Sequence, residues 1–250
     1  MIGVIGGVGP YAGLDLVAKV LDNTIAHSDQ EHLPLIHLSL PGRIHDRTEF
    51  LMGKTPVNPG IELSGLVRMA VDAGARVIGI PCNTSHVPTI YQHLQSCVSE
   101  IKEEVVLVNM VEEVIKTLKE KQSSIRSVGV LATNGTYYSQ IYKESLEEAG
   151  FEVVRPDETT QTTLVHPAIY GPEGIKTCSN PISEKASDTV KYAVRTLIAN
   201  GAEAIVLACT ELPLVFPGQS HFQGVELIDS TSILARALIK RAAPKQLLAI

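Results

Sequence analysis

The sequence predicts an α/β protein of two similar lobes, each a mostly parallel sheet with helices on both faces. Two features of the chain predict this fold. Short apolar runs alternate with longer amphipathic stretches along the chain, which is typical of a parallel sheet covered by helices. The second half of the chain also repeats part of the first. With 250 residues, the chain is long enough for one large domain or two small lobes.

Seven short apolar runs, many of them bounded by Gly or Pro, are predicted to be buried strands. In chain order they are Ile2–Gly6, Leu35–Leu40, Val77–Ile80, Val105–Val108, Ser127–Leu131, Ala204–Ala208 and Val225–Ile228. Amphipathic stretches between them are predicted to be helices. These are Tyr11–Ala26, Glu62–Ala73, Met110–Glu120, Tyr137–Ala149 and Glu184–Asn200. Connections between parallel strands should be right-handed.

The internal repeat is carried by two pairs of segments. Ala73–Thr84 matches Asn200–Glu211, at an offset of 200 − 73 = 127 residues. Upstream, Gly3–Gly7 matches Gly129–Thr133, at an offset of 129 − 3 = 126 residues. Two matches at nearly the same offset, half a chain apart, indicate two lobes of similar construction.

We therefore expect a first lobe of residues 1–111 together with about 229–250, and a second lobe of residues 112–228. The closing helix, Ser230–Ala242, is expected to return to the first lobe. Two similar lobes would enclose an active site in the cleft between them, at the carboxyl ends of their strands.

Composition excludes several classes of protein. The net charge is −6 and the Lys and Arg residues are scattered, so neither nucleic acid nor an anionic membrane is an expected partner. No apolar run approaches the roughly eighteen residues of a membrane helix, and the N-terminus has no basic leader. The four cysteines lack CxxC spacing. We therefore expect a cytoplasmic protein with reduced thiols.

Cys82 and Cys209 occupy the same position of the repeat, each at the carboxyl end of a predicted strand. Each precedes a predicted helix start, with Thr84 or Thr210 as the capping candidate. A helix N-terminus lowers the pKa of a nearby thiol. If the two lobes face each other, these thiols point at a common centre from opposite sides. Cys97 lies in a helical pattern, where packing is its expected role.

Two opposed thiols suit the inversion of a stereocentre. One group removes a proton from one face of a carbon while the other delivers a proton to the opposite face, and the two exchange roles for the other enantiomer. Hydroxyl and N–H donors near the strand ends would stabilise the negative charge that develops. The available donors are Asn83, Thr84, Thr133 and Thr210. The predicted chemistry is racemisation without a cofactor.

The chain resembles the aspartate/glutamate racemase superfamily, and within it the aspartate racemase branch, over nearly its whole length. The motifs that carry the resemblance are Gly6–Pro10, Asp29–His32, Asp46–Thr48, Pro81–His86, Leu131–Thr136, Ile169–Tyr170, Ile175–Lys176, Ala208–Pro213 and Ile228–Ser230. The resemblance implies two catalytic cysteines, no pyridoxal phosphate, an amino-acid substrate and a homodimer.

The resemblance also implies binding residues. It assigns Arg47 and Lys176 to substrate carboxylates, which agrees with the bidentate fork of Arg and the compact charge of Lys. The substrate-binding set is then Gly7, Val8, Arg47, Asn83, Thr84, Thr133, Lys176, Thr210 and Glu211. The Thr210-Glu211 pair is similar to the aspartate-type motif and favours aspartate as substrate. Val8, Ser85 and Thr177-Cys178 depart from the family pattern, so a broad-specificity racemase stays open.

Four other interpretations remain. The Gly7–Ala12 segment fits a loose GxGxxA dinucleotide-binding pattern, with Glu31 as its acidic partner. Cys82 and His86 are spaced as two metal ligands or as a Cys–His nucleophile pair, although no further ligands cluster with them. The last interpretation is a non-catalytic, two-lobed protein that binds a small molecule. We expect no metal, because the paired thiols are explained without one.

Overall fold

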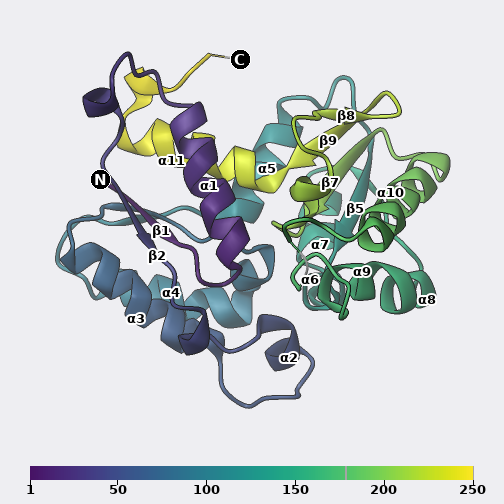
Figure 1. The fold of residues 1–250 in the computed structure, drawn as a ribbon, viewed down its shortest axis with the longest axis horizontal. Coiled ribbons are helices and arrows are strands. Elements are labelled where there is room, and N and C mark those ends of the chain that lie inside the picture. Colours follow the sequence, from purple (N-terminus) through teal and green to yellow (C-terminus); the bar gives the residue numbers. More distant parts are fainter. Residues whose placement is uncertain (178, 250) are drawn as a thin grey trace. The chain divides into compact units, whose positions relative to one another are not determined.

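The computed structural model describes residues 1–177 and 179–249, so Cys178 lies outside the described residues. The chain divides into two compact units. One comprises Met1–Glu113 and Thr231–Ile250, and the other comprises Val114–Ser230. Figure 1 shows the ribbon coloured along the sequence, with the closing helix in yellow.

The first unit contains a parallel four-stranded sheet in the order β2-β1-β3-β4. Its strands are β1 (Ile2–Ile5), β2 (Leu35–Leu38), β3 (Val77–Gly79) and β4 (Val106–Leu107). Its larger helices are α1 (Pro10–Asp22), α3 (Pro59–Asp72), α4 (Pro88–Ser99) and α11 (Ser230–Ala242). Shorter elements are α2 (Arg47–Leu51) and the 3-10 turns η1 (Asp29–Glu31), η2 (Pro41–Arg43), η3 (Asn83–His86) and η6 (Pro244–Gln246).

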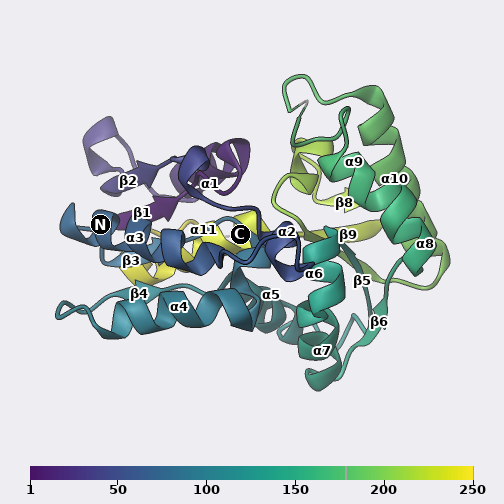
Figure 2. The same ribbon diagram turned by 90° about the horizontal axis from the view of Figure 1, so that it is seen from below.

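Two apolar clusters fill the first unit. One joins α1 and α11 to the strands through residues such as Leu16, Val20, Leu234 and Leu238. The other joins α3 and α4 to the strands, and Figure 2 shows α4 beside β4. Helices therefore cover the sheet with two separate sets of buried side chains, as the alternation of apolar runs and amphipathic stretches predicts.

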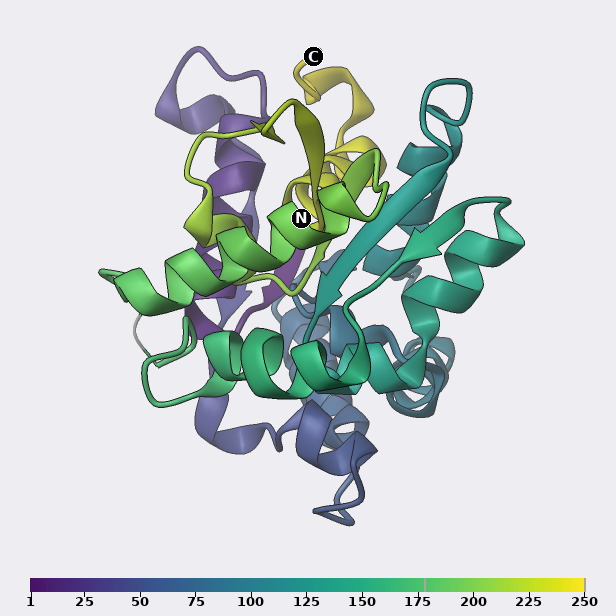
Figure 3. The same ribbon diagram turned by 90° about the vertical axis from the view of Figure 1, so that its right-hand side faces the viewer.

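The second unit contains a five-stranded sheet in the order β6-β5-β7-β9-β8, in which β8 alone is antiparallel. Its strands are β5 (Ser127–Ala132), β6 (Glu152–Val154), β7 (Ala204–Ala208), β8 (His221–Phe222) and β9 (Val225–Asp229). Its helical elements are α6 (Asn134–Ser139), α7 (Ile141–Glu148), α8 (Glu158–Thr160), the π-helix η4 (Gln161–Val165), α9 (His166–Tyr170), α10 (Glu184–Ala199) and the 3-10 turn η5 (Leu212–Val215). Figure 3 shows α10 lying across this sheet, and α5 (Met110–Lys119) runs from one unit into the other.

The predicted α/β class is confirmed, with two mostly parallel sheets covered by helices. Several predicted bounds are wrong. The segment predicted as one helix, Tyr137–Ala149, contains two helices, because Gln140 adopts a left-handed conformation with φ of 59° and ends α6. The short strands β6 and β8 and the helices α2, α8 and α9 were not predicted, and α4 was indicated only by the helical pattern around Cys97.

The sequence repeat is a repeat of packing. Gly3 in β1 leaves no room for a Cβ, which would overlap the side chains of Ile78 and Ala75. At Gly129 in β5, the space for a Cβ is filled in the same way by Ile205 and Ala202. These residues lie 127 positions after Ile78 and Ala75. Gly74 and Gly201, which also match, both have positive φ, 101° and 94°. Equivalent glycines therefore serve the same close approach and the same turn in both sheets.

Within the described parts of the chain, no helix combines the length and the apolar character needed to cross a bilayer.

Candidate functional site

Both candidate catalytic cysteines lie just beyond the carboxyl end of an interior strand. Cys82 follows β3 after two further residues, and Cys209 follows β7 directly. The two strands hold the same place in their sheets, because β3 lies between β1 and β4 as β7 lies between β5 and β9. Ligands of open parallel sheets bind at this edge. Each unit therefore presents one thiol at the position where α/β proteins place their chemistry.

The predicted helix starts after the cysteines are wrong. A 3-10 turn, and not an α-helix, follows each of them. Thr84 lies inside η3, whose cap position is Cys82, and Glu211 holds the cap position of η5. Neither turn has a side-chain capping hydrogen bond. Such short turns add little helix dipole, so the thiols must be tuned by other neighbours.

In the first unit, Arg47 is held as a buried cation. It is the first residue of α2, and Asp46 caps that helix by accepting a hydrogen bond from the Glu49 N–H at 2.8 Å. Arg47 is only 6% exposed, and its guanidinium donates to the backbone oxygens of Val8, at 2.8 Å, and His45, at 3.2 Å. Arg47 thus ties α2 to the loop after β1.

The same unit brings Arg47 toward the Cys82 turn, because α2 packs against η3. Cys82 is partly exposed, whereas Asn83 and Thr84 are buried. Gly7, in the loop after β1, would carry a Cβ only 2.6 Å from the backbone nitrogen of Leu40. That close approach accounts for glycine at position 7.

The dinucleotide interpretation does not fit this unit. In such sites the acidic residue follows the second strand, on the same edge as the glycine loop. Glu31 precedes β2 and lies in η1, at the opposite end of the strand. Its carboxylate accepts a hydrogen bond from the His27 N–H at 2.7 Å. Ser39 and Leu40 are the residues that follow β2.

His86 also departs from the roles that its spacing suggested. Its Nδ1 lies 2.9 Å from the backbone carbonyl of Cys82, so the contact is with the backbone and not with the thiol. Burial lowers the pKa of His86 to about 4, against smaller opposing effects of the Cys82 and Val108 carbonyls. No group of three or more potential metal-ligating side chains occurs among residues 1–177 and 179–249.

In the second unit, four predicted site residues form one connected group. The Cys209 thiol donates to Glu211 Oε2 at 3.1 Å, and the Lys176 ammonium pairs with Glu211 Oε1 at 2.5 Å. Thr210 Oγ1 lies 3.4 Å from Glu211 Oε2. Cys209, Thr210 and Glu211 are all buried. The carboxylate of Glu211 is therefore the centre of the group, with a cation on one oxygen and a thiol on the other.

This group raises the pKa of the Cys209 thiol. Burial is the largest cause, and the negative charge of Glu211 adds to it, while Lys176 acts in the opposite direction. The expectation that a helix N-terminus lowers the pKa is therefore wrong for Cys209. At neutral pH Cys209 holds its proton and presents it to Glu211.

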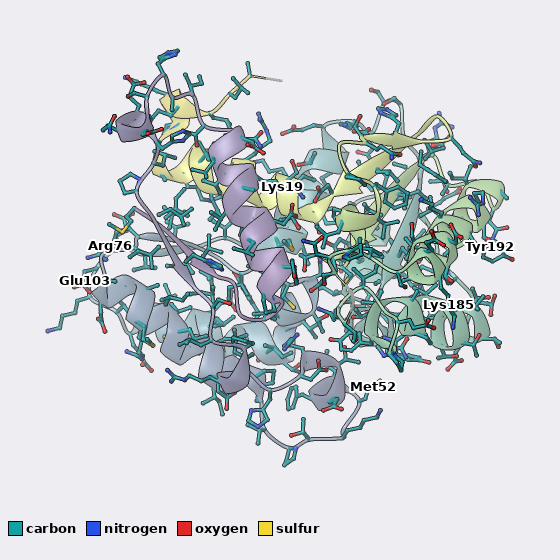
Figure 4. The ribbon with its side chains drawn as sticks, viewed as in Figure 1. Lys19, Met52, Arg76, Glu103, Lys185 and Tyr192 are labelled. Carbon is teal, nitrogen blue, oxygen red and sulfur yellow. The ribbon has the colours of Figure 1, made fainter. Side chains whose placement is uncertain are left out.

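The Lys176–Glu211 pair is more buried than an ion pair on the protein surface. Lys185, labelled in Figure 4, pairs with Glu173 at 2.7 Å, but both side chains are more than half exposed. The Glu211 side chain is 3% exposed, so its charge is screened much less by water.

Sequence reasoning assigned no role to an aromatic pair beside Lys176 or to a buried amide beside Thr133. The Lys176 ammonium lies 5.3 Å from the centroid of the Tyr170 ring, which stacks on His166 at 4.8 Å. Buried Gln161 donates to the backbone oxygen of Ala132 at 3.0 Å, immediately before Thr133. Gln161 lies in the π-helix, a rare form that often occurs at functional sites. Single polar residues in an amphipathic stretch give no sequence signal of this kind.

Thr133 is placed beside Cys209 by strand register. Ala132, the last residue of β5, pairs with Ala208, the last residue of β7. Thr133 and Cys209 are the next residues on these neighbouring strands, and Thr133 is 3% exposed. The structure thus gathers Val8, Arg47, Cys82, Asn83 and Thr84 in one unit and Thr133, Lys176, Cys209, Thr210 and Glu211 in the other.

Comparisons with known proteins bear on this arrangement. The model of the family described as Asp/Glu/Hydantoin racemase matches residues 5–238. The chain is 26% identical over 249 residues to a protein of Bacillus subtilis (strain 168) described as the broad specificity amino-acid racemase RacX, and the match covers 96% of each chain.

Solved structures give the same picture of the fold. Picrophilus torridus aspartate racemase matches with a TM-score of 0.76 and 27% identity, over 96% of this chain and 93% of that chain. Glutamate racemase from Francisella tularensis subsp. tularensis SCHU S4, solved in complex with D-glutamate, has a TM-score of 0.64 at 18% identity. That match covers 99% of this chain and 82% of the other, and it shows a shared fold alone.

Proposed function

Because the chain belongs to the Asp/Glu/hydantoin racemase family and is an isomerase, we propose that it racemises an amino acid without a cofactor, with aspartate preferred. In this proposal Cys82 and Cys209 are the acid and base. The predicted superfamily is confirmed, and the aspartate branch stays a prediction. The observation that carries the proposal is the occurrence of one thiol at the equivalent strand end of each sheet.

The proposed reaction begins with Cys82 as thiolate and Cys209 as thiol. Cys82 takes the α-proton of one enantiomer, and the electron pair stays on the α-carbon and its carboxylate. Cys209 then delivers its proton to the opposite face, which leaves Cys82 as thiol and Cys209 as thiolate. The other enantiomer is converted by the same steps in reverse, so protons balance over the two directions.

Lys176 and Glu211 support the second half of this cycle. The hydrogen bond from Cys209 to Glu211 holds a proton where the acid needs it. When Cys209 becomes a thiolate, it must do so beside the negative charge of Glu211, and the Lys176 ammonium offsets that charge. Without the lysine, two adjacent anions would occur in a buried environment.

Buried donors would stabilise the substrate carboxylate as the α-carbon gains negative charge. The buried polar groups beside the thiols are Asn83, Thr84, Thr133 and Thr210. Arg47 is proposed to bind the side-chain carboxylate of aspartate, because a buried guanidinium fork matches the two oxygens of a carboxylate. Lys176 is proposed to contribute to carboxylate binding.

Broad specificity is a second candidate, favoured by the 26% identity to RacX over 96% of both chains. Both candidates use the same two thiols and differ only in what surrounds the substrate side chain. The aspartate form of the proposal depends on Arg47 and on the Thr210-Glu211 pair.

A chiral screen separates the candidates. Each proteinogenic amino acid is incubated with the protein in heavy water without added pyridoxal phosphate, and both enantiomers and α-deuterium are measured. Preferred turnover of aspartate supports the main proposal, and turnover of many neutral amino acids supports broad specificity. Absence of α-deuterium in every amino acid, with folded protein, would refute racemisation altogether.

A further inference from the structure

His86 lies in the last position of η3 and is 2% exposed. With its pKa lowered to about 4 by burial, the ring is neutral at neutral pH and carries a single N–H. Among the described residues, Nε2 of the ring has no hydrogen-bond partner, whereas Nδ1 lies 2.9 Å from the Cys82 carbonyl, which only accepts hydrogen bonds; the tautomer that fits these contacts therefore carries its proton on Nδ1 and donates it to Cys82. The tautomer of His86 is therefore fixed by the residue that carries the candidate catalytic thiol.

The Cys82 carbonyl is held from two directions. It also accepts a hydrogen bond from the Ser85 N–H at 3.1 Å, while the Cys82 N–H donates to the Ile80 carbonyl at 2.8 Å. The Ser85 bond closes the 3-10 turn, and the His86 bond adds a side-chain donor that the turn by itself lacks. Together they set the rotation of the peptide group between Cys82 and Asn83.

That rotation decides where the next N–H points. A trans peptide is planar, with its carbonyl and N–H on opposite sides. With the Cys82 carbonyl turned into η3, the Asn83 N–H is directed away from the turn. Rotation of this peptide would therefore move the N–H relative to the Cys82 side chain. Fixed N–H groups of this kind stabilise anions.

The ring of His86 is itself anchored. It packs against Tyr91 in α4, with 5.1 Å between ring centroids and 33° between ring planes. Tyr91 is 6% exposed and belongs to the apolar cluster beneath the sheet. The Cys82 carbonyl is in this way connected through His86 to the buried face of α4.

We propose that His86 is the positioning residue of Cys82, acting through the backbone carbonyl and not through the thiol. The inference rests on the proposed function for the claim that Cys82 exchanges a proton with substrate. His86 keeps the Cys82 thiol and the Asn83 N–H in a single arrangement and stays neutral while doing so. It is neither the partner of a Cys–His nucleophile nor a metal ligand.

Three variants test the proposal. His86→Asn keeps an N–H donor close to the position of Nδ1, His86→Gln places its amide one bond further out, and His86→Leu removes the donor. His93→Asn, an exposed position on α4, is the matched control. Two readouts are measured for each: alkylation of Cys82 by iodoacetamide against pH, followed on its own peptide by mass spectrometry, and kcat and KM for racemisation.

The expected result is specific to the donor. In His86→Leu and His86→Gln, Cys82 is alkylated at least several-fold more slowly at neutral pH, and kcat falls about 10-fold or more with a smaller change in KM. His86→Asn recovers most of both readouts, and His93→Asn matches the unchanged protein.

Two results would overturn the proposal: an unchanged Cys82 alkylation profile in folded His86→Leu or His86→Gln, or equal losses in Asn, Gln and Leu variants. If His86→Leu does not fold, the comparison of Asn with Gln decides. Alkylation needs no turnover, so failure of the proposed function can be told apart from failure of this proposal. If the proposed function is wrong, the unchanged protein racemises no amino acid, while substitution of His86 still changes the alkylation of Cys82.

Discussion

At the scale of single residues, the two candidate thiols differ in their surroundings. Cys82 is partly exposed and its carbonyl is held by His86, whereas Cys209 is 5% exposed and donates to a carboxylate. Burial and Glu211 both raise the pKa of Cys209. Equivalent positions of the repeat have thus acquired unequal chemistry, with Cys209 as the thiol that starts protonated.

Replacement of either thiol is expected to stop racemisation while leaving half of the reaction. Cys82→Ser and Cys209→Ser should each lose racemisation by at least 10²-fold, the lower range for a positioned acid or base. Each should still exchange the α-proton of one enantiomer for deuterium, because one face keeps its base, and the two variants should favour opposite enantiomers.

Deuterium incorporation from D- and L-aspartate in heavy water measures this selectivity. Cys97→Ser is the control, since Cys97 is buried within α4 in the packing role predicted for it. Full racemisation by either single variant would remove that cysteine from the mechanism.

Glu211→Gln is expected to shift the pH dependence downward. Loss of the Glu211 charge removes one cause of the raised pKa of Cys209 and leaves the Lys176 ammonium, which lowers that pKa. Cys209 then deprotonates at lower pH. Rates that need the Cys209 thiolate should begin to rise at a lower pH than in the unchanged protein. Rates that need its thiol should begin to fall at a lower pH as well.

The kcat profile of each enantiomer against pH measures these limbs. Glu173→Gln is a matched control, because Glu173 makes the same kind of ion pair with Lys185 on the surface. A Glu211→Gln profile that is unchanged, or shifted to higher pH, would contradict the assigned role of Glu211.

At the scale of helices and strands, the sequence predicted those elements whose bounds are decided by the pattern of hydrophobic residues. The strand Ala204–Ala208 and the helix Ser230–Ala242 have the predicted bounds, and most other strands differ by one or two residues. Elements whose pattern is weak were missed, such as the two-residue strand β8 and the five-residue helix α2. Asp46 and Glu49 are spaced as a capping pair and were the available signal for α2.

Candidate site residues were predictable where the repeat or a motif marks them. Cys82 and Cys209 stand at matching strand ends, and Lys176, Cys209 and Glu211 are joined by direct contacts. The position of Gln161 was not predictable, and Tyr170 was marked by the Ile169–Tyr170 motif without a role, because a π-helix and a ring near an ammonium arise from tertiary packing. The same holds for the raised pKa of Cys209, which burial decides.

Gly129→Ala should destabilise the second unit. Its Cβ would lie 3.0 Å from the Ala202 Cβ and 3.4 Å from the Leu197 Cβ, and closer still to Ile205. Overpacking of this kind costs about 1–3 kcal/mol of unfolding free energy. Gly65→Ala in α3 is the control, because nothing lies within 4 Å of its Cβ and alanine is better in a helix by about 1 kcal/mol.

Urea unfolding of both variants measures the difference. The prediction would be wrong if Gly129→Ala were as stable as the unchanged protein. The repeat extends the expectation to Gly3→Ala, whose Cβ would meet Ile78 and Ala75 in the first unit.

At the scale of the whole molecule, each sheet supplies a complete half of a potential site. The order β2-β1-β3-β4 recurs as β6-β5-β7-β9, with β8 added at one edge. Val8, Arg47 and Cys82 belong to one unit, and Lys176, Cys209 and Glu211 belong to the other. The proposed racemisation requires both halves to act on one carbon.

This requirement predicts a chemical cross-link. Reacting atoms stand about 3–3.5 Å apart, so sulfurs on both sides of one carbon would be roughly 7 Å apart. A four-carbon bis-alkylating reagent such as 1,4-dibromobutane-2,3-dione should join Cys82 to Cys209, and aspartate should slow the reaction.

Peptide mapping identifies the linked pair, and Cys97→Ser should give the same product. Independent alkylation of Cys82 and Cys209, with no linked peptide, would contradict the two-thiol mechanism.

The hydrogen bond between Cys209 and Glu211 has a consequence for steady-state kinetics. Mirror-image amino acids have equal free energies in water, so a racemase cannot favour one of them in kcat/KM, however different its two thiols are. If Glu211 makes the enzyme treat the two enantiomers differently, then kcat and KM must differ between the enantiomers by the same factor. The enantiomer that is turned over faster at saturation should then be the one bound with the higher KM.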